Sequence, residues 1–231
     1  MLSCTALLTV TITACATTGL TFSTTVSALR APLLPASRTY WLISGMEGVG
    51  NDDLQFQEAK RLVVTALTQQ WFVQAASPDA ASQVIVLTYG IGNPTEQTYT
   101  YLAPQLGMVP RSTTLNGTIT STGNTSKVAA TATTQSTLGI TGLSSEVGTY
   151  TTYTRYLLVS SLDLDHYRVT KSVKELWKTG AVSTGSSGDL RLVLPYLVVA
   201  SGVYFGKSTD HMIEQTIGED DKRIIALKNS R

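Results

Sequence analysis

The sequence predicts an α+β fold: a mixed, mostly antiparallel sheet with two helices packed on one face and a Thr/Ser-rich β-hairpin or loop insertion. Three observations predict it. Several short segments alternate apolar and polar residues or form the apolar runs typical of strands. Two segments, about 53–70 and the one after Asp189, repeat apolar residues at helical spacing. The chain has 231 residues, 42% of them hydrophobic, which suffices for one domain with a core.

The chain before residue 39 is predicted to be a tether. Residues 16–38 are rich in Thr and Ser and sustain no period, and Pro32 and Pro35 prevent a helix from running through them. A single domain is therefore expected over 39–231.

The first half of this domain is predicted to run strand, helix, strand, strand. Residues 39–44 are rich in aromatic and β-branched types, which favour a strand. Residues 51–53 offer N-cap side chains to a helix over about 53–70. A short strand is expected at 71–75. The near-continuous apolar run at 83–89 then predicts a strand buried on both faces.

The middle of the chain has an unusual composition. Between residues 97 and 154 the charged side chains are Arg111, Lys127 and Glu146, while Thr, Ser, Gly and Tyr dominate. Gly123 and Asn124 lie between two β-prone segments and fit a hairpin turn. The segment is either a long antiparallel excursion or a disordered loop; the Thr content favours extended backbone, and the low charge argues against a disordered tail.

An exposed, uncharged β-ribbon tends to aggregate unless something covers it. We therefore predict that the insertion, at about 97–152, contacts a partner. The predicted contact residues are Thr118, Thr120, Lys127, Thr131 and Thr133.

The second half of the domain is predicted to contain one further helix. Asp189 caps it, Pro195 either kinks it or marks its effective start, and Gly206 ends it. The remaining predicted strands cover residues 153–169, 174–179, 212–217 and 223–227.

No constellation of side chains predicts catalysis. Asp163, Asp165 and His166 form the one acidic–histidine cluster, but strand alternation places His166 on the face opposite the two carboxylates. We expect no enzyme activity, no metal and no cofactor. The net charge of +1 gives no electrostatic field for nucleic acid, so we expect no such partner.

The N-terminus carries a recognisable motif. A short apolar run at 6–10 leads into Ile12-Thr13-Ala14-Cys15, which resembles the lipobox of bacterial lipoproteins. The resemblance implies a signal peptide over 1–14, acylation (palmitate among the chains) of Cys15, and a tether over 15–38. Because Ala16 is not the Asp of the inner-membrane sorting rule, it also implies the periplasmic face of the outer membrane. The alternative is a small buried strand that ends in Cys.

With its weaker motifs over 12–95 and 155–227, the chain resembles small bacterial envelope lipoproteins with a compact α/β domain. This resemblance implies a non-enzymatic outer-membrane lipoprotein, a structural or accessory subunit of an envelope or secretion assembly. Its Thr-rich segment would contact other envelope proteins or further copies of the chain. The alternative is a periplasmic ligand- or glycan-binding lipoprotein in which tyrosines form stacking surfaces, although packing of the tyrosines as cross-strand pairs is the preferred explanation. These tyrosines are Tyr99, Tyr101, Tyr150, Tyr153 and Tyr156.

Overall fold

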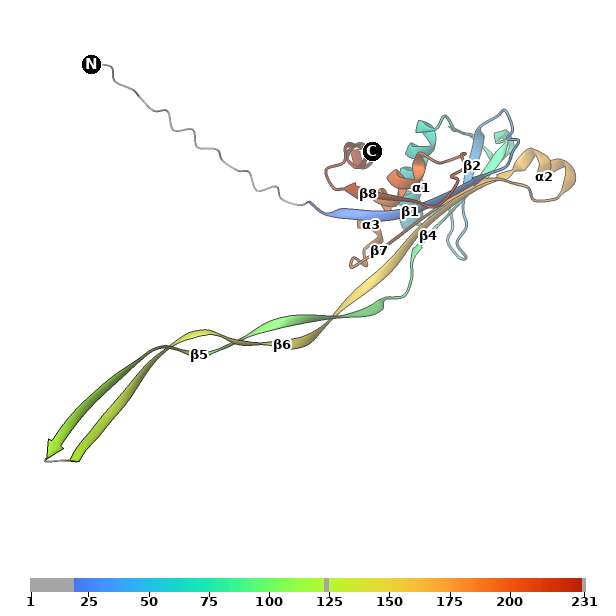
Figure 1. Ribbon diagram of the computed structural model, residues 1–231. Coiled ribbons are helices and arrows are strands. Elements are labelled where there is room, and N and C mark those ends of the chain that lie inside the picture. The colour runs from blue at the N-terminus through green and yellow to red at the C-terminus, as the bar shows by residue number, and fades with distance from the viewer. Residues whose placement is uncertain (1–18, 123–124, 230–231) are drawn as a thin grey trace, which may run out of the picture. The chain divides into compact units, whose positions relative to one another are not determined.

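The computed structural model describes residues 19–122 and 125–229 (Figure 1). These residues form two compact units. Unit 1 comprises the residues up to Pro94 and those from Thr152 onward, and unit 2 is Thr95–Thr151. The predicted signal peptide, Cys15 and the predicted turn at Gly123-Asn124 lie outside the described residues.

Unit 1 is built on a twisted mixed sheet with the strand order β3-β2-β4-β6-β7-β1-β8. The pairs β2–β3 and β2–β4 are parallel, and the other neighbours are antiparallel. The strands are β1 (Thr21–Arg30), β2 (Thr39–Ser44), β3 (Val73–Gln74), β4 (Gln83–Ile91), β6 (Thr125–Asp163), β7 (Glu175–Gly185) and β8 (Ile213–Gly218). The eighth strand, β5 (Thr95–Thr122), pairs with β6.

Three helices pack against each other and cover one face of this sheet. They are α1 (Leu54–Gln69), α3 (Leu190–Gly202) and α4 (Lys222–Asn229). Their apolar faces meet the inward residues of the strands in one core, in which Trp177 lies between the rings of Phe72 and Phe205. The α2 helix (Leu164–Thr170) and the 3-10 turn η1 (Pro78–Ala80) lie where β4 begins and β6 ends.

The predicted tether is wrong for residues 21–30, which form β1. This strand pairs with β7 on one side and β8 on the other. Its even-numbered residues from Phe22 to Ala28 are buried and its odd-numbered residues are exposed, the period-two pattern of a half-buried strand. Small polar residues mask this pattern in the sequence, because the buried set includes Thr24.

The predicted fold class is also wrong. Strands take up 51% of the structure and helices 23%, so the protein is mostly sheet, with four helices where two were expected. Two segments predicted as strand are helical. Residues 164–170 form α2 because Asp163 accepts a hydrogen bond from the His166 amide and caps the helix. Residues 222–229 form α4, whose buried Ile224 and Leu227 are three residues apart.

Other local predictions are confirmed. The α1 helix begins after Asp53, whose carboxylate accepts from the Phe56 amide at 2.8 Å, and α3 begins after Asp189, which caps it. Two details of α3 differ from the prediction: Pro195 lies inside the helix and not at its start, and the helix ends at Gly202, before Gly206, whose φ of 73° favours glycine.

Candidate interaction surface

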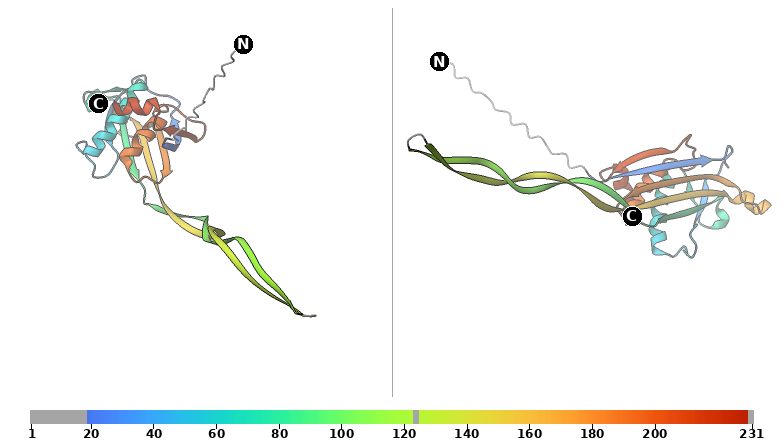
Figure 2. Two further views of the ribbon diagram at one scale, coloured as in Figure 1. Left: turned by 90° about the vertical axis from the view of Figure 1, so that its left-hand side faces the viewer. Right: turned by 60° about the horizontal axis from the view of Figure 1, so that its bottom comes forward.

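Unit 2 is a two-stranded antiparallel ribbon, hereafter the ribbon, made of β5 and residues 125–151 of β6. The two strands run side by side along their length in every view (Figure 2). Its many Thr residues and its tyrosines favour extended backbone. Within the described parts of the chain, the buried core cluster includes no residue of the ribbon, so the ribbon lacks a core of its own.

The ribbon instead exposes large apolar side chains. Seven aliphatic residues are 62–68% exposed, and three tyrosines are about half exposed. These residues are Leu102, Leu106, Met108, Leu138, Ile140, Leu143, Val147, Tyr99, Tyr101 and Tyr150. Such a density of exposed apolar side chains marks an interaction surface or an aggregation hazard.

These side chains occupy both faces of the ribbon. The ring of Tyr99 lies 5.7 Å from that of Tyr101 and 5.9 Å from that of Tyr150, which places the three on one face. The Tyr101 hydroxyl donates to Glu146 on the same face. Because side chains alternate along a strand, Leu102 and Val147 lie on the other face. A partner lying against one face alone would leave apolar surface exposed.

The register of the ribbon changes along its length. The Ser144 hydroxyl donates to the Ala103 carbonyl and the Thr141 hydroxyl to the Gln105 carbonyl, while the Thr141 side chain also lies against Gly107. From the first of these contacts to the last, β5 advances by four residues and β6 by three. Such an irregularity, typical of a β-bulge, shifts which residues share a face. Sequence alternation alone therefore misses the pairing of Met108 with Ile140, which follows from the contact of Val109 with Gly139.

The predicted contact residues lie in the part of the ribbon nearer residues 122 and 125. Thr118, Thr120, Thr131 and Thr133 are all exposed. They share one face, because Gly117 on β5 faces Ala130 on β6, so their neighbours along each strand lie on the opposite side. Lys127 belongs to β6, and its side chain lies outside the described set. The structure thus places four of the predicted contact residues on one face of the ribbon. The exposed aliphatic residues, which the sequence analysis did not predict as contacts, lie nearer the end of the ribbon at residues 95 and 151.

The five tyrosines proposed as a stacking surface are divided between the units. Tyr99, Tyr101 and Tyr150 cluster in the ribbon, whereas Tyr153 and Tyr156 belong to unit 1. Tyr99 and Tyr150 contact each other across the two strands, as expected for cross-strand packing.

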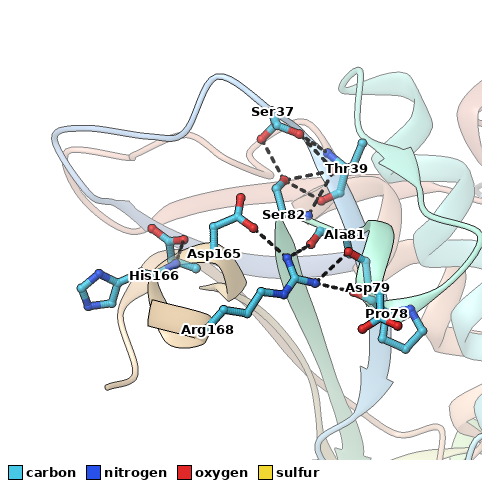
Figure 3. Close-up of polar contacts among 10 residues, drawn as sticks. Ser37, Thr39, Pro78, Asp79, Ala81, Ser82, Asp165, His166 and Arg168 are labelled. Carbon is cyan, nitrogen blue, oxygen red and sulfur yellow. Dashed lines mark hydrogen bonds and ion pairs between the residues drawn. The ribbon is translucent and has the colours of Figure 1, made fainter. Parts of the chain in front are cut away.

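The predicted acidic–histidine cluster has a structural role at α2. Asp163 caps the helix, and Asp165 forms an ion pair with Arg168 at 2.7 Å. Figure 3 shows the Arg168 guanidinium directed at the chain around η1, where it donates to the carbonyls of Pro78, Asp79 and Ala81. The His166 ring contacts Ser172 at 3.0 Å instead of the carboxylates. These interactions therefore hold α2 against η1.

A groove of about 420 Å³ in unit 1 lies between the starts of α1 and α3. It is lined by Tyr89 and by the ion pair of Arg191 with Glu58, whose atoms approach to 2.8 Å. Burial, aided by the negative charges of Asp53 and Glu58, raises the pKa of Tyr89. The carboxylates of Asp53 and Asp189 accept hydrogen bonds from the first-turn amides of α1 and α3 beside this groove.

Arg155 is the buried cation of unit 1. Its guanidinium donates to the Ser183 hydroxyl and to the carbonyls of Tyr153 and Ser187, and burial lowers its pKa. It does not line the groove between the starts of α1 and α3. Within residues 19–122 and 125–229, no three His, Cys, Asp or Glu side chains gather in a way that would hold a metal ion. None of the helices in these ranges has the length and hydropathy of a membrane span.

Comparisons with known proteins assign neither a family nor a function to this chain. No protein-family model matches the chain, and no curated protein matches it. Among solved structures, it is similar to a PDZ domain protein from Parabacteroides distasonis, with 8% identity and a TM-score of 0.37. The match covers 87% of this chain and 40% of that one, so this chain spans less than half of its length. A likeness this weak carries no argument about fold or function.

Proposed function

We propose that this protein is a non-enzymatic subunit of a cell-envelope assembly, held at the periplasmic face of the outer membrane by a lipid on Cys15, and that the ribbon is its contact element. The observation that carries the proposal is the exposure of aliphatic and aromatic side chains on both faces of a ribbon without a core. An isolated two-stranded hairpin is at best marginally stable in water. A partner that covers the ribbon would bury its exposed apolar side chains and so stabilise it.

The composition of the ribbon supports a protein partner. Residues 95–151 contain four charged side chains, Glu96, Arg111, Lys127 and Glu146. Depletion of charged residues is typical of the buried centre of an interface. The lipid anchor rests on the lipobox alone, and intact-mass measurement of membrane-extracted protein, with Cys15→Ser as the control, tests it separately.

The contact role is tested by removing the ribbon. In unit 1 the Gly92 amide donates to the Thr154 carbonyl at 2.8 Å, so residues 95–151 can be replaced by a short Asn-Gly turn beyond this pair. We expect this variant to fold and to lose the proteins that cross-link to the wild-type chain in membranes. Retention of the same partners would contradict the proposal.

Point variants locate the contact within the ribbon. Replacing Leu106, Met108 and Ile140 with Thr keeps strand propensity but removes exposed apolar area. The matched control is Val169→Thr, a residue of unit 1 that is 85% exposed. We expect partner capture to fall at least about ten-fold in the ribbon variant and to stay unchanged in the control, as loss of well-packed anchors predicts.

The glycan-binding alternative has one observation in its favour, the cluster of Tyr99, Tyr101 and Tyr150. Exposed aromatic faces bind sugars by stacking. Calorimetric titration of envelope glycans into the wild-type chain and into Tyr99→Ala separates the two functions. Binding that the alanine variant loses would favour the alternative.

A further inference from the structure

A second groove in unit 1 lies where the parallel strands β2 and β4 end. It is lined by Met46 and Val49, which follow β2, and by Gly90 and Ile91 at the carboxyl end of β4. The chain leaves these two strands in opposite directions across the sheet: after β2 it continues through α1 to β3, whereas after β4 it continues to β5 and β6. In sheets covered by helices, ligands commonly bind in the crevice at such a switch point. We call this groove, of about 510 Å³, the β2–β4 groove.

Tyr89 supplies the β2–β4 groove with a polar group that has no partner. The side chain lines the groove, although it is only 5% exposed and belongs to the core cluster. Within residues 19–122 and 125–229, no hydrogen bond engages its hydroxyl. Burial, and after it the negative charges of Asp53 and Glu58, raise the pKa of Tyr89, so the hydroxyl is protonated at neutral pH and lies near these carboxylates. Because buried polar groups are nearly always hydrogen-bonded, this hydroxyl points to a ligand.

Two carboxylates line the same groove. Asp53 and Asp189 cap α1 and α3, and in each of them Oδ1 accepts from amides of the first helical turn. Among the described residues, no partner engages either Oδ2. The cation among the described lining residues is Arg191, which is paired with Glu58 at 2.8 Å. The groove therefore has an excess of negative charge.

These groups fit a primary ammonium ion on an aliphatic chain. Asp53, Asp189 and Tyr89 offer three acceptors from three different elements, and a primary ammonium has three donors. An anion is disfavoured, because the free oxygens of both carboxylates would repel it. Apolar side chains of the lining would contact the methylene groups of the chain. These side chains are Met46, Val49, Ile91 and Leu190.

We propose that the β2–β4 groove binds a primary alkylammonium group, supplied by a free polyamine or by a lysine side chain of a peptide. The ammonium donates to the free oxygens of Asp53 and Asp189 and to the hydroxyl of Tyr89. All the lining residues belong to unit 1, so this site does not depend on the contact role proposed for the ribbon.

Calorimetric titration of the purified full-length chain tests the class of ligand. The probes are putrescine, the capped lysine Nα-acetyl-lysine methylamide and, as the uncharged control, butanediol. We expect saturable binding of at least one amine with a Kd below about 1 mM and no binding of the diol. Tighter binding of putrescine identifies a free polyamine as the source, and tighter binding of the capped lysine identifies a peptide. If neither amine binds, or if the diol binds equally, the proposal is overturned.

Three variants test the location of the site. Asp53→Asn and Asp189→Asn keep an oxygen that caps the helix but remove the charge. Each should weaken amine binding at least about ten-fold, as expected for the loss of a hydrogen bond to a charged group, and Tyr89→Phe should weaken it about five-fold. The matched control is Asp163→Asn, because Asp163 also caps a helix but lies opposite Gln83, where β4 begins. This variant should bind the amine as the wild type does.

Urea unfolding of the same variants separates a lost site from a lost fold. We expect Tyr89→Phe to unfold at the wild-type midpoint or above it, because its hydroxyl has no protein partner to lose. Its binding therefore decides the question if an asparagine variant unfolds early. Wild-type affinity in all three groove variants, or an equal loss in Asp163→Asn, would exclude this site.

Discussion

Replacing Phe22 with alanine tests whether β1 belongs to the core. Phe22 is 8% exposed, and its ring stacks on that of Tyr196 with centroids 4.0 Å apart. It therefore joins β1 to α3. In a tether, by contrast, this side chain would contact nothing, and its removal would leave stability unchanged.

The expected loss follows from the burial. Truncating a buried phenylalanine to alanine typically costs about 3–5 kcal/mol, and the slight exposure of Phe22 favours the lower value of about 3 kcal/mol. With a urea m-value of about 2 kcal/mol/M for a domain of this size, the midpoint of unfolding should fall by about 1.5 M. All three tryptophans, Trp41, Trp71 and Trp177, belong to unit 1, so their fluorescence reports on this unit alone.

Ser27→Ala is the matched control, because Ser27 lies on the exposed face of the same strand. We expect this variant to unfold within about 0.5 kcal/mol of the wild type. If Phe22→Ala also stays within that margin, β1 does not contribute to the core, and the tether interpretation of residues 21–30 returns.

Four further outcomes are expected. The buried Tyr40 hydroxyl has no partner among the described residues, so Tyr40→Phe should leave stability unchanged or raise it by about 1 kcal/mol, measured by urea unfolding. Burial raises the pKa of Tyr40 to about 12, so the wild type should lose stability as the pH rises from about 10 toward 12, and Tyr40→Phe should not show this loss. The hydrogen bond from Arg223 lowers the pKa of Asp221, so its contribution exists above the unfolded-state pKa and is lost as the pH falls through the folded-state pKa; Asp221→Asn should therefore unfold at a lower urea midpoint than the wild type at pH 6 but not at pH 3. Replacing Pro104 and Pro110 with alanine supplies two more backbone donors in β5 and should increase self-association of the chain, measured by light scattering.

The sequence predicts best where a local interaction decides the structure. Asp53 and Asp189 begin helices because their carboxylates accept from amides two or three residues ahead, a requirement visible in sequence. The same chemistry at Asp163 was missed, because the alternation of apolar residues before it favoured a longer strand. Burial does alternate up to Asp163, but the buried residues are the odd-numbered ones from Arg155 onward, and the cap then converts the chain to α2.

Most of the features that the sequence did not predict depend on strand pairing between distant parts of the chain. The β1 strand contains few large apolar residues, and it is a strand because β7 and β8 flank it, more than 140 residues away in the chain. The insertion was recognised from its charge depletion, and its bounds lie close to those of unit 2. Which residues share a face of the ribbon was not accessible, because a change of register between residues 103 and 107 breaks the simple alternation.

The two units divide the apolar residues of the chain in opposite ways, and this division accounts for the low charge of the insertion. Unit 1 places its large apolar side chains mainly inside, around Trp177 and Tyr196. No apolar side chain described for unit 2 is buried, and many lie at the surface, where a charged neighbour would improve solubility. Such charges are nearly absent from the ribbon. Over nearly sixty residues the sequence has almost no surface charge to keep the ribbon soluble. This composition suits a ribbon that a partner covers, because a charged side chain buried in the interface would need a partner of its own. The same argument explains why its tyrosines and threonines, which satisfy hydrogen bonds without a charge, replace the lysines and glutamates of an ordinary exposed strand.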